Sequence, residues 1–225
     1  MKVKLFLAVF VLTFLTVSCI SQQNKPSKTI VDIAPDNPYL CQGYYHSDKS
    51  PYILPFSIGM EYKLVQGNCT RYSHKGFSRY AYDFGMPIGS EIIAARSGVV
   101  TFVETDMYDN TRRGKRRHKR IPNARGNTIL IEHEDGTIAA YFHLKYNGAL
   151  VQKGDLVKQG QPIALSGSSG FTTGPHLHFE VRRSNEDRQS LPVTFRNADP
   201  GEDFSLQAGN YYTALPFEQD KFASK

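Results

Sequence analysis

Short apolar runs with a period of two, separated by glycine turns, dominate the middle of the chain. The clearest is residues 174–181 (GPHLHFEV), in which apolar residues alternate with two histidines. Because successive side chains on a strand point to opposite faces, His176 and His178 share one face and the apolar residues take the other. The pattern predicts a strand that packs on one side and presents two imidazoles on the other.

The same alternation predicts further short strands. We expect them over residues 52–56, 62–65, 80–84, 92–103 (two strands about a Ser-Gly turn), 127–133, 138–144, 151–165 (short strands between two glycine turns) and 191–195. Asp135 and Gly136 form a tight turn that makes a hairpin of the strands on either side. After residue 195 we expect an irregular tail. With no long helical period, and with aromatic residues at 12%, the chain is predicted to be mainly β.

Three residues in or beside these strands carry candidate chemistry. Asp83 is the only carboxylate between Tyr80 and Ser90 and lies within an aromatic strand, where a buried charge needs a partner or a metal. His74 lies on the loop that enters this strand. His143 ends the second strand of the hairpin and, taken alone, indicates only a partly buried histidine.

Positive charge is concentrated in one loop, predicted over residues 104–126. Residues 112–120, from Arg112 to Arg120, carry seven positive charges, and without them the formal net charge of +6 would be −1. We expect a solvated insertion. The alternative is a contact with an anionic envelope polymer or lipid headgroups. Nucleic acid is not expected as a partner, because no binding face interleaves aromatic and basic residues.

The N-terminus has the form of a bacterial export signal. Residues 1–18 combine a basic start with an apolar core of 13 residues, too short for an ordinary transmembrane helix. The stretch before Cys19 resembles a lipobox, so we expect Cys19 to be the lipidated mature N-terminus; the alternative is a plain cleaved signal. Because Ile20 follows Cys19, a two-membrane bacterium would place the protein at the outer membrane. Residues 19–50 are expected to form a tether and an N-terminal extension.

Two further cysteines remain, Cys41 and Cys69. An even pair in an exported protein indicates a disulfide, which would stabilise the domain by roughly 3–4 kcal/mol. Two free thiols are the alternative, because sequence does not give the distance between them.

Taken together, six ordered landmarks resemble those of the lysostaphin-type (LytM-type) zinc metallopeptidases, which cleave peptidoglycan. They are His-x-Gly before Asp-Phe-x-x-Pro (residues 74–87), Ala-x-x-x-Gly-x-Val (94–100), Ile-x-His-x-Asp-Gly (131–136), Tyr-x-His-Leu (141–144), Val-x-x-Gly-Gln-x-Ile (157–163) and Thr-Gly-Pro-His-Leu-His-Phe-Glu (173–180). The resemblance covers about residues 51 to 183.

The resemblance implies that His74, Asp83 and His178 ligate one zinc ion. It implies that His143 and His176 face the metal-activated water without binding metal. Two imidazoles and one carboxylate leave a tetrahedral position open, as in catalytic zinc sites. The chain departs from the shorter family pattern, since eight residues rather than three separate His74 from Asp83.

The family also implies a fold and a function. The fold is two antiparallel sheets that form a groove, a barrel-sandwich-like core over residues 51–183, with residues 184–225 as a C-terminal extension. The function is hydrolysis of peptide bonds in peptidoglycan stems or cross-links, in the bacterial cell envelope. The alternative is a non-catalytic envelope protein that binds peptidoglycan or activates an amidase. A biotinyl- or lipoyl-like carrier is disfavoured, because no lysine lies in the expected Met-Lys-Met context.

Overall fold

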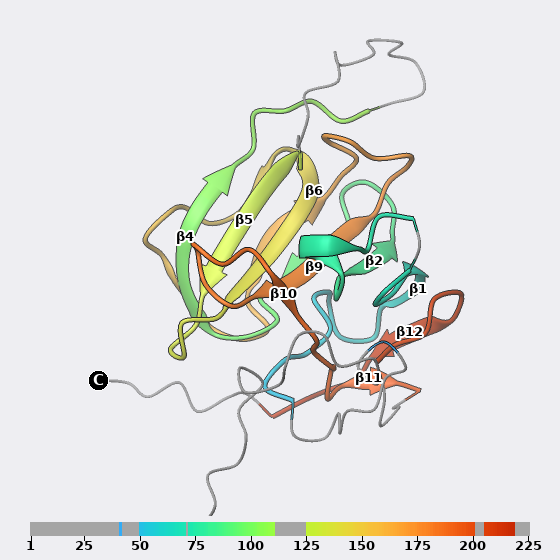
Figure 1. Ribbon diagram of the computed structural model, residues 1–225. Coiled ribbons are helices and arrows are strands. Elements are labelled where there is room, and N and C mark those ends of the chain that lie inside the picture. The colour runs from blue at the N-terminus through green and yellow to red at the C-terminus, as the bar shows by residue number, and fades with distance from the viewer. Residues whose placement is uncertain (1–40, 42–49, 71, 111–124, 201–204, 219–225) are drawn as a thin grey trace, which may run out of the picture.

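The protein consists almost entirely of short antiparallel strands (Figure 1). The structure, a computed structural model, describes residues 41, 50–70, 72–110, 125–200 and 205–218. Its elements are β1 (Glu61–Gln66), the 3₁₀ helix η3 (Gly76–Ser78), β2 (Tyr82–Gly85), β3 (Glu91–Ile93), β4 (Gly98–Glu104), β5 (Asn127–Glu132), β6 (Ile138–Ala149), β7 (Leu156–Val157), β8 (Pro162–Ser166), β9 (Leu177–Arg182), β10 (Ser190–Leu191), β11 (Ala198–Asp199) and β12 (Tyr211–Ala214). The mainly β class is therefore confirmed.

Hydrogen bonds join these strands into one open, branched sheet. Its main path is β11-β12-β1-β2-β9-β6-β5-β4-β7. The long strand β6 is the branch point. Its residues 138–144 pair with β5 and 138–142 with β9, whereas Leu144 and Ala149 pair with β8. Strand β3 in turn pairs with β8. The layers expected from sequence are thus connected through β6.

Strand β9 lies at the centre of this path, between β2 and β6. Leu177, Phe179 and Val181 are fully buried, as their alternation predicts. Phe179 makes edge-on or tilted ring contacts with Tyr141 of β6 and with Phe195. Buried aromatic rings of this kind dominate core energetics, so the apolar face of β9 holds the site strand in place.

The C-terminal part of the chain is not the irregular tail that we expected. Strand β12 pairs with β1 in antiparallel register, and Tyr212 and Ala214 are fully buried. Phe195, before β11, also joins the core cluster. Sequence alternation missed β12 because it is only four residues long. The boundary at residue 183 stays a prediction, although the sheet continues beyond it.

At the start of the domain the strand prediction was partly wrong. Residues 52–56 form no strand, and Phe56 makes a single bridge to Ile92. The segment is nevertheless buried, because Ile53 N donates to the Ala95 carbonyl and Leu54 N donates to the Asn197 side chain. The hairpin of β5 and β6 matches its prediction, with β6 five residues longer at its C-terminal end.

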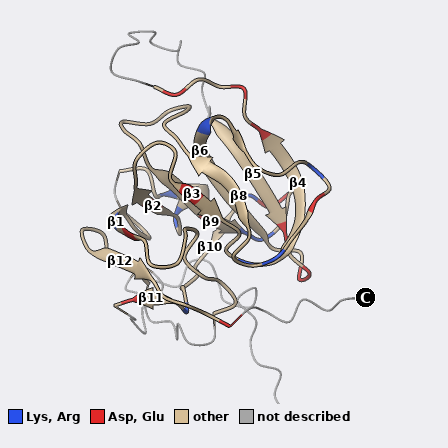
Figure 2. Cartoon of the chain, turned by 180° about the vertical axis from the view of Figure 1, so that it is seen from behind, with Lys and Arg blue, Asp and Glu red and all other residues tan. Residues whose placement is uncertain are grey.

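Basic and acidic positions are both spread along the described part of the chain in the view from behind (Figure 2). The export signal, Cys19 and residues 112–120 lie outside the described residues. Cys41 and Cys69 form a disulfide. In the part of the chain that the structure describes, no helix is long and apolar enough to cross a membrane.

Candidate metal centre

Strand pairing brings Asp83 and His178 together. In the antiparallel register of β2 and β9, Asp83 lies directly opposite His178, so their side chains project from the same face. The pairs on either side, including Tyr82 with Phe179, project into the core. The Asp83 Oδ1 to His178 Nδ1 distance is 2.9 Å. The period-two pattern of each strand therefore builds half of the candidate site.

His74 reaches the same point from the loop between β1 and β2. Its Nδ1 donates a hydrogen bond to the Gly67 carbonyl oxygen at 2.7 Å. A neutral ring held in this way carries its lone pair on Nε2, and Nε2 lies 3.1 Å from Asp83 Oδ1. Helix η3 takes up part of the long spacing between His74 and Asp83. The two side chains are in contact despite the extra residues.

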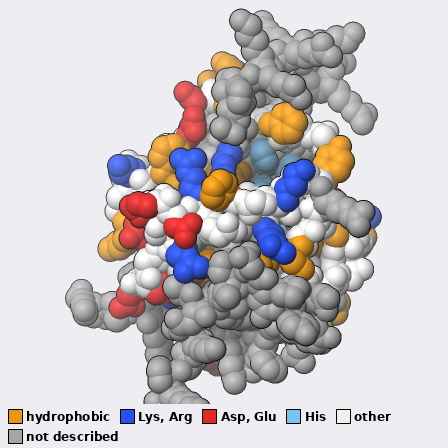
Figure 3. Space-filling model, in the orientation of Figure 1, with side chains coloured by type: hydrophobic (Ala, Val, Ile, Leu, Met, Phe, Trp, Pro, Cys, Tyr) orange, Lys and Arg blue, Asp and Glu red, His pale blue; other side chains and the backbone are white. Residues whose placement is uncertain are grey.

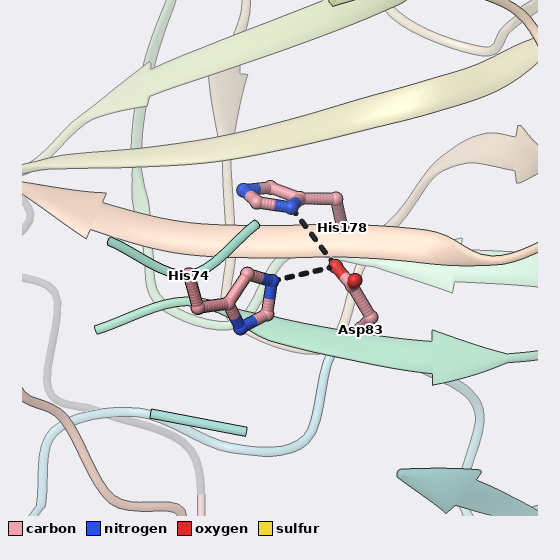
Figure 4. Close-up of side chains that lie close together, drawn as sticks. All are labelled: His74, Asp83 and His178. Carbon is pink, nitrogen blue, oxygen red and sulfur yellow. Dashed lines mark ion pairs between the residues drawn. The ribbon is translucent and has the colours of Figure 1, made fainter. Parts of the chain in front are cut away.

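The three side chains fit a metal ion. His74 Nε2, Asp83 Oδ1 and His178 Nδ1 all lie within 4.8 Å of one another (Figure 4). His74 Nε2 and Asp83 Oδ1 are buried, and neither has a hydrogen-bond partner among the residues that the structure describes. Two lone-pair atoms that face each other in a buried place are costly unless a metal ion or a proton lies between them. Two nitrogens and one carboxylate oxygen are a donor set that suits catalytic zinc.

Charge coupling at this centre is strong. Burial alone would raise the pKa of the Asp83 carboxyl, yet the imidazoles of His178 and His74 hold that pKa well below its usual value. Burial opposes protonation of His178, but the Asp83 and Glu180 carboxylates raise its pKa to about 9. A metal ion at His178 would therefore displace a proton, and its binding would weaken at low pH.

A bulge in β6 aims His143 at the site. Thr128 pairs with Phe142 and Asn127 pairs with Leu144, so His143 has no opposite residue in β5. Its φ is +62°, the left-handed conformation that a bulge residue adopts and that non-glycine residues rarely take. Without the bulge, His143 would face away from Phe142, which lies opposite His178. The strained backbone thus places the imidazole among the other histidines.

The environment of His143 keeps its ring neutral. Nδ1 donates to the Ser169 carbonyl oxygen at 2.8 Å, which leaves Nε2 as an acceptor. Burial lowers the pKa of His143 to about 3, and repulsion from His176 and His178 adds to this effect.

His176 lies just before β9, with its ring centroid 4.7 Å from that of His143. Its Nδ1 lies 2.9 Å from the Gly174 carbonyl oxygen and 3.0 Å from Thr172 Oγ1. The opposite nitrogen, Nε2, lies 3.8 Å from Asp83 Oδ1. Its side chain is 14% exposed, whereas that of His74 is fully buried. Histidine side chains are visible at the surface between hydrophobic and basic side chains (Figure 3). The side chain of His178 is 13% exposed, so the centre is open on one side.

All five residues expected from sequence therefore meet in one place. The sequence model of Peptidase family M23 matches residues 77–190, about half of the chain, which includes four of the five and begins just after His74. The chain belongs to peptidase family M23. The match shows that the landmarks seen in the sequence are those of this family.

Curated relatives of this M23 chain include two named enzymes. Peptidoglycan DD-endopeptidase ShyB of Vibrio cholerae is 41% identical over 117 residues, which are 52% of this chain and 22% of ShyB. Lysostaphin of Staphylococcus simulans is 38% identical over 107 residues, 47% of this chain and 18% of lysostaphin. The chain thus spans about a fifth of the length of these relatives. A solved structure of lysostaphin aligns with a TM-score of 0.44 and 30% identity, covering 59% of this chain and 47% of that one.

Sequence reasoning missed Glu180, which contacts His178 of the M23 centre on the side of the ring away from Asp83. Glu180 is fully buried, and its Oε2 lies 3.2 Å from His178 Nε2. Nε2 donates this bond, which leaves Nδ1 to face Asp83. Arg182 Nε and Arg125 Nη1 donate to Glu180 Oε1 and neutralise the carboxylate. A carboxylate that fixes the tautomer of a ligating histidine is a common second partner in zinc sites. Its position two residues after His178 on the same strand face was the available signal.

Sequence reasoning also missed Gln66, which holds the Asp83 carboxylate. Its Nε2 donates to Asp83 Oδ2 at 2.7 Å, so Oδ1 is the oxygen left for the imidazoles. A register shift in β1 after Leu64 places Gln66 opposite Asp83. No sequence pattern marks this residue, because the shift arises from strand pairing.

We expect Glu180→Gln to weaken zinc binding about 10- to 100-fold while the protein stays folded. The amide keeps the shape of the side chain but removes the negative charge that holds the proton on His178 Nε2. Competition with a chelator of known affinity measures the dissociation constant. Glu134→Gln is the matched control, since Glu134 is exposed and should leave the constant unchanged. Equal affinities for the two variants would contradict a supporting role for Glu180.

Proposed function

We propose that the protein is a zinc-dependent endopeptidase that hydrolyses peptide bonds of peptidoglycan stems or cross-links. The observation that carries the proposal is the convergence of His74 Nε2, His178 Nδ1 and Asp83 Oδ1. Two of these atoms are buried without a hydrogen-bond partner in the described part of the chain. These residues would hold one zinc ion. When bound, zinc supplies Lewis acidity and lowers the pKa of water from 15.7 towards about 7.

His143 and His176 would move the protons. Each ring has its Nδ1 beside a carbonyl oxygen, so each neutral ring presents Nε2 as an acceptor. One of the two accepts a proton from the attacking water and later donates it to the leaving amine. The other takes a proton from solvent and then faces the oxyanion that develops on the scissile carbonyl. The geometry supports this division between three metal-holding residues and two proton-handling residues.

The substrate class is inferred from the relatives. ShyB is named as a peptidoglycan DD-endopeptidase, and the curated relatives also include a DD-carboxypeptidase/endopeptidase of Neisseria meningitidis. We therefore propose peptidoglycan peptides as substrate and the bacterial envelope as location. Within that location, Cys19 would anchor the chain to the membrane by lipid. Residues 112–120 would form a solvated insertion, with contact to anionic polymer or headgroups as the alternative. Residues 51–183 would be the peptidase domain, followed by the extension 184–225.

Digestion of purified peptidoglycan tests the proposal. Wild-type protein should hold about one zinc ion per chain and release new amine ends, and fragment masses would identify the bond. His176→Ala should keep its zinc but lose activity about 10²- to 10⁴-fold, because it removes a proton carrier and no ligand.

The other outcomes point elsewhere. If the wild type holds zinc but leaves walls from several bacteria intact, a peptidoglycan-binding or amidase-activating protein replaces the peptidase. If it holds no zinc, the assignment of the three ligands is wrong.

A further inference from the structure

The segment between β4 and β5, residues 105–126, is an insertion whose two ends (its root) lie beside the candidate site. The two strands pair up to Glu104 and Thr128 and then separate. Asn127 closes the root of the insertion, since its side-chain oxygen accepts from Met107 N at 2.9 Å and its Nδ2 donates to the Met107 carbonyl at 2.8 Å. The described residues just after this closure, Tyr108 to Asn110, leave the sheet and approach the loop that follows β8.

Asp109 and Asn110 make three hydrogen bonds to that loop and one to β6. Asp109 Oδ1 accepts from Ser168 N at 2.7 Å, and Oδ2 accepts from Tyr146 N at 3.2 Å. Asn110 N donates to the Ser168 carbonyl at 2.9 Å, and Asn110 Nδ2 donates to the Gly170 carbonyl at 2.7 Å. The contact is tight, because a Cβ at Gly167 would lie 2.5 Å from Asp109 Oδ1.

Ser169, in the middle of that loop, is the residue that holds His143. It is fully buried, its carbonyl accepts from His143 Nδ1, and its Oγ accepts from Asn127 N and donates to the Leu144 carbonyl. The root of the insertion therefore binds both neighbours of Ser169 and Ser169 itself. The backbone of His143 is strained, so the imidazole depends on this carbonyl for its orientation.

We propose that Asp109 is a positioning residue for His143, acting through the Ser168–Ser169 backbone. One carboxylate fixes two backbone N–H groups, Ser168 on the loop and Tyr146 on β6, and so holds the loop against the strand that carries His143. The proposed effect on catalysis rests on the proposed function; the effect on the imidazole does not.

Asp109→Ala removes both acceptors and should lower kcat about 10- to 100-fold, with KM within about twofold, because small displacements of a catalytic group have effects of this size. Asp109→Asn keeps one acceptor and should retain more activity. Asp106→Ala is the matched control: Asp106 is exposed in the same segment and makes no hydrogen bond among the described residues. All variants are compared as zinc-loaded full chains.

A second readout is independent of turnover. The ¹⁵N chemical shifts of the His143 ring, measured by NMR on protein labelled with ¹⁵N-histidine, report which ring nitrogen carries the proton. Wild type and Asp106→Ala should show only the Nδ1–H form, whereas Asp109→Ala should show a mixture. An unchanged His143 signal in Asp109→Ala overturns the inference. If Asp109→Ala does not fold, Asp109→Asn decides by the same signal. A wild type that cuts no substrate would refute the proposed function, and the signal would still test Asp109.

Discussion

Asp83→Asn is expected to abolish zinc binding and peptidase activity. Asp83 Oδ1 faces both His74 Nε2 and His178 Nδ1, and it supplies the only negative charge among the three donors. An amide oxygen is a neutral and much weaker ligand for zinc, so activity should fall at least about 10³-fold, equivalent to roughly 4 kcal/mol in the barrier. Metal analysis and a peptidoglycan digestion assay measure the two losses separately.

Thermal unfolding gives a third measurement. Zinc binds the folded state, so it should raise the melting temperature of the wild type and leave that of Asp83→Asn unchanged. Asp106→Asn removes a charge from an exposed position and should behave as the wild type does. Retention of wild-type zinc affinity by Asp83→Asn would show that the metal, if any, binds elsewhere.

Phe179→Ala is expected to give the largest loss of stability among single substitutions of the site strand. Phe179 is fully buried in β9 between Tyr82 of β2 and Tyr141 of β6, which lie opposite it in register. Truncation removes its ring contacts with Tyr141 and Phe195 and leaves a cavity. The free energy of unfolding should fall by about 3–5 kcal/mol. Urea denaturation followed by far-UV circular dichroism measures the change, since the chain has no tryptophan for fluorescence.

The matched control is Phe171→Ala. Phe171 is 78% exposed, so its truncation should change stability by no more than about 0.5 kcal/mol. Because Phe179 lies between His178 and Glu180 on β9, its loss should also weaken zinc binding. A decrease below about 1 kcal/mol for Phe179→Ala would mean that β9 is held in place by other contacts.

Sequence by itself predicted most of the strands around the site and the five residues that meet there. Alternation in β9 predicts that His176 and His178 share a face, and the burial of Phe179 confirms which face packs. The turn at Asp135 and Gly136 predicts the hairpin of β5 and β6, and the ordered landmarks predict the family. These features are local in the chain, because side-chain period and turn geometry depend on neighbouring residues.

Only the tertiary structure decided how the remaining groups meet. The bulge that turns His143 towards the site depends on its register with β5, and the shift that brings Gln66 to Asp83 depends on β1 and β2. Asp109 reaches Ser168 across 59 residues of sequence. Such contacts come from pairing between distant segments, which the period of one strand does not specify. Sequence thus predicted the five residues of the candidate site, and packing decided which atoms face one another.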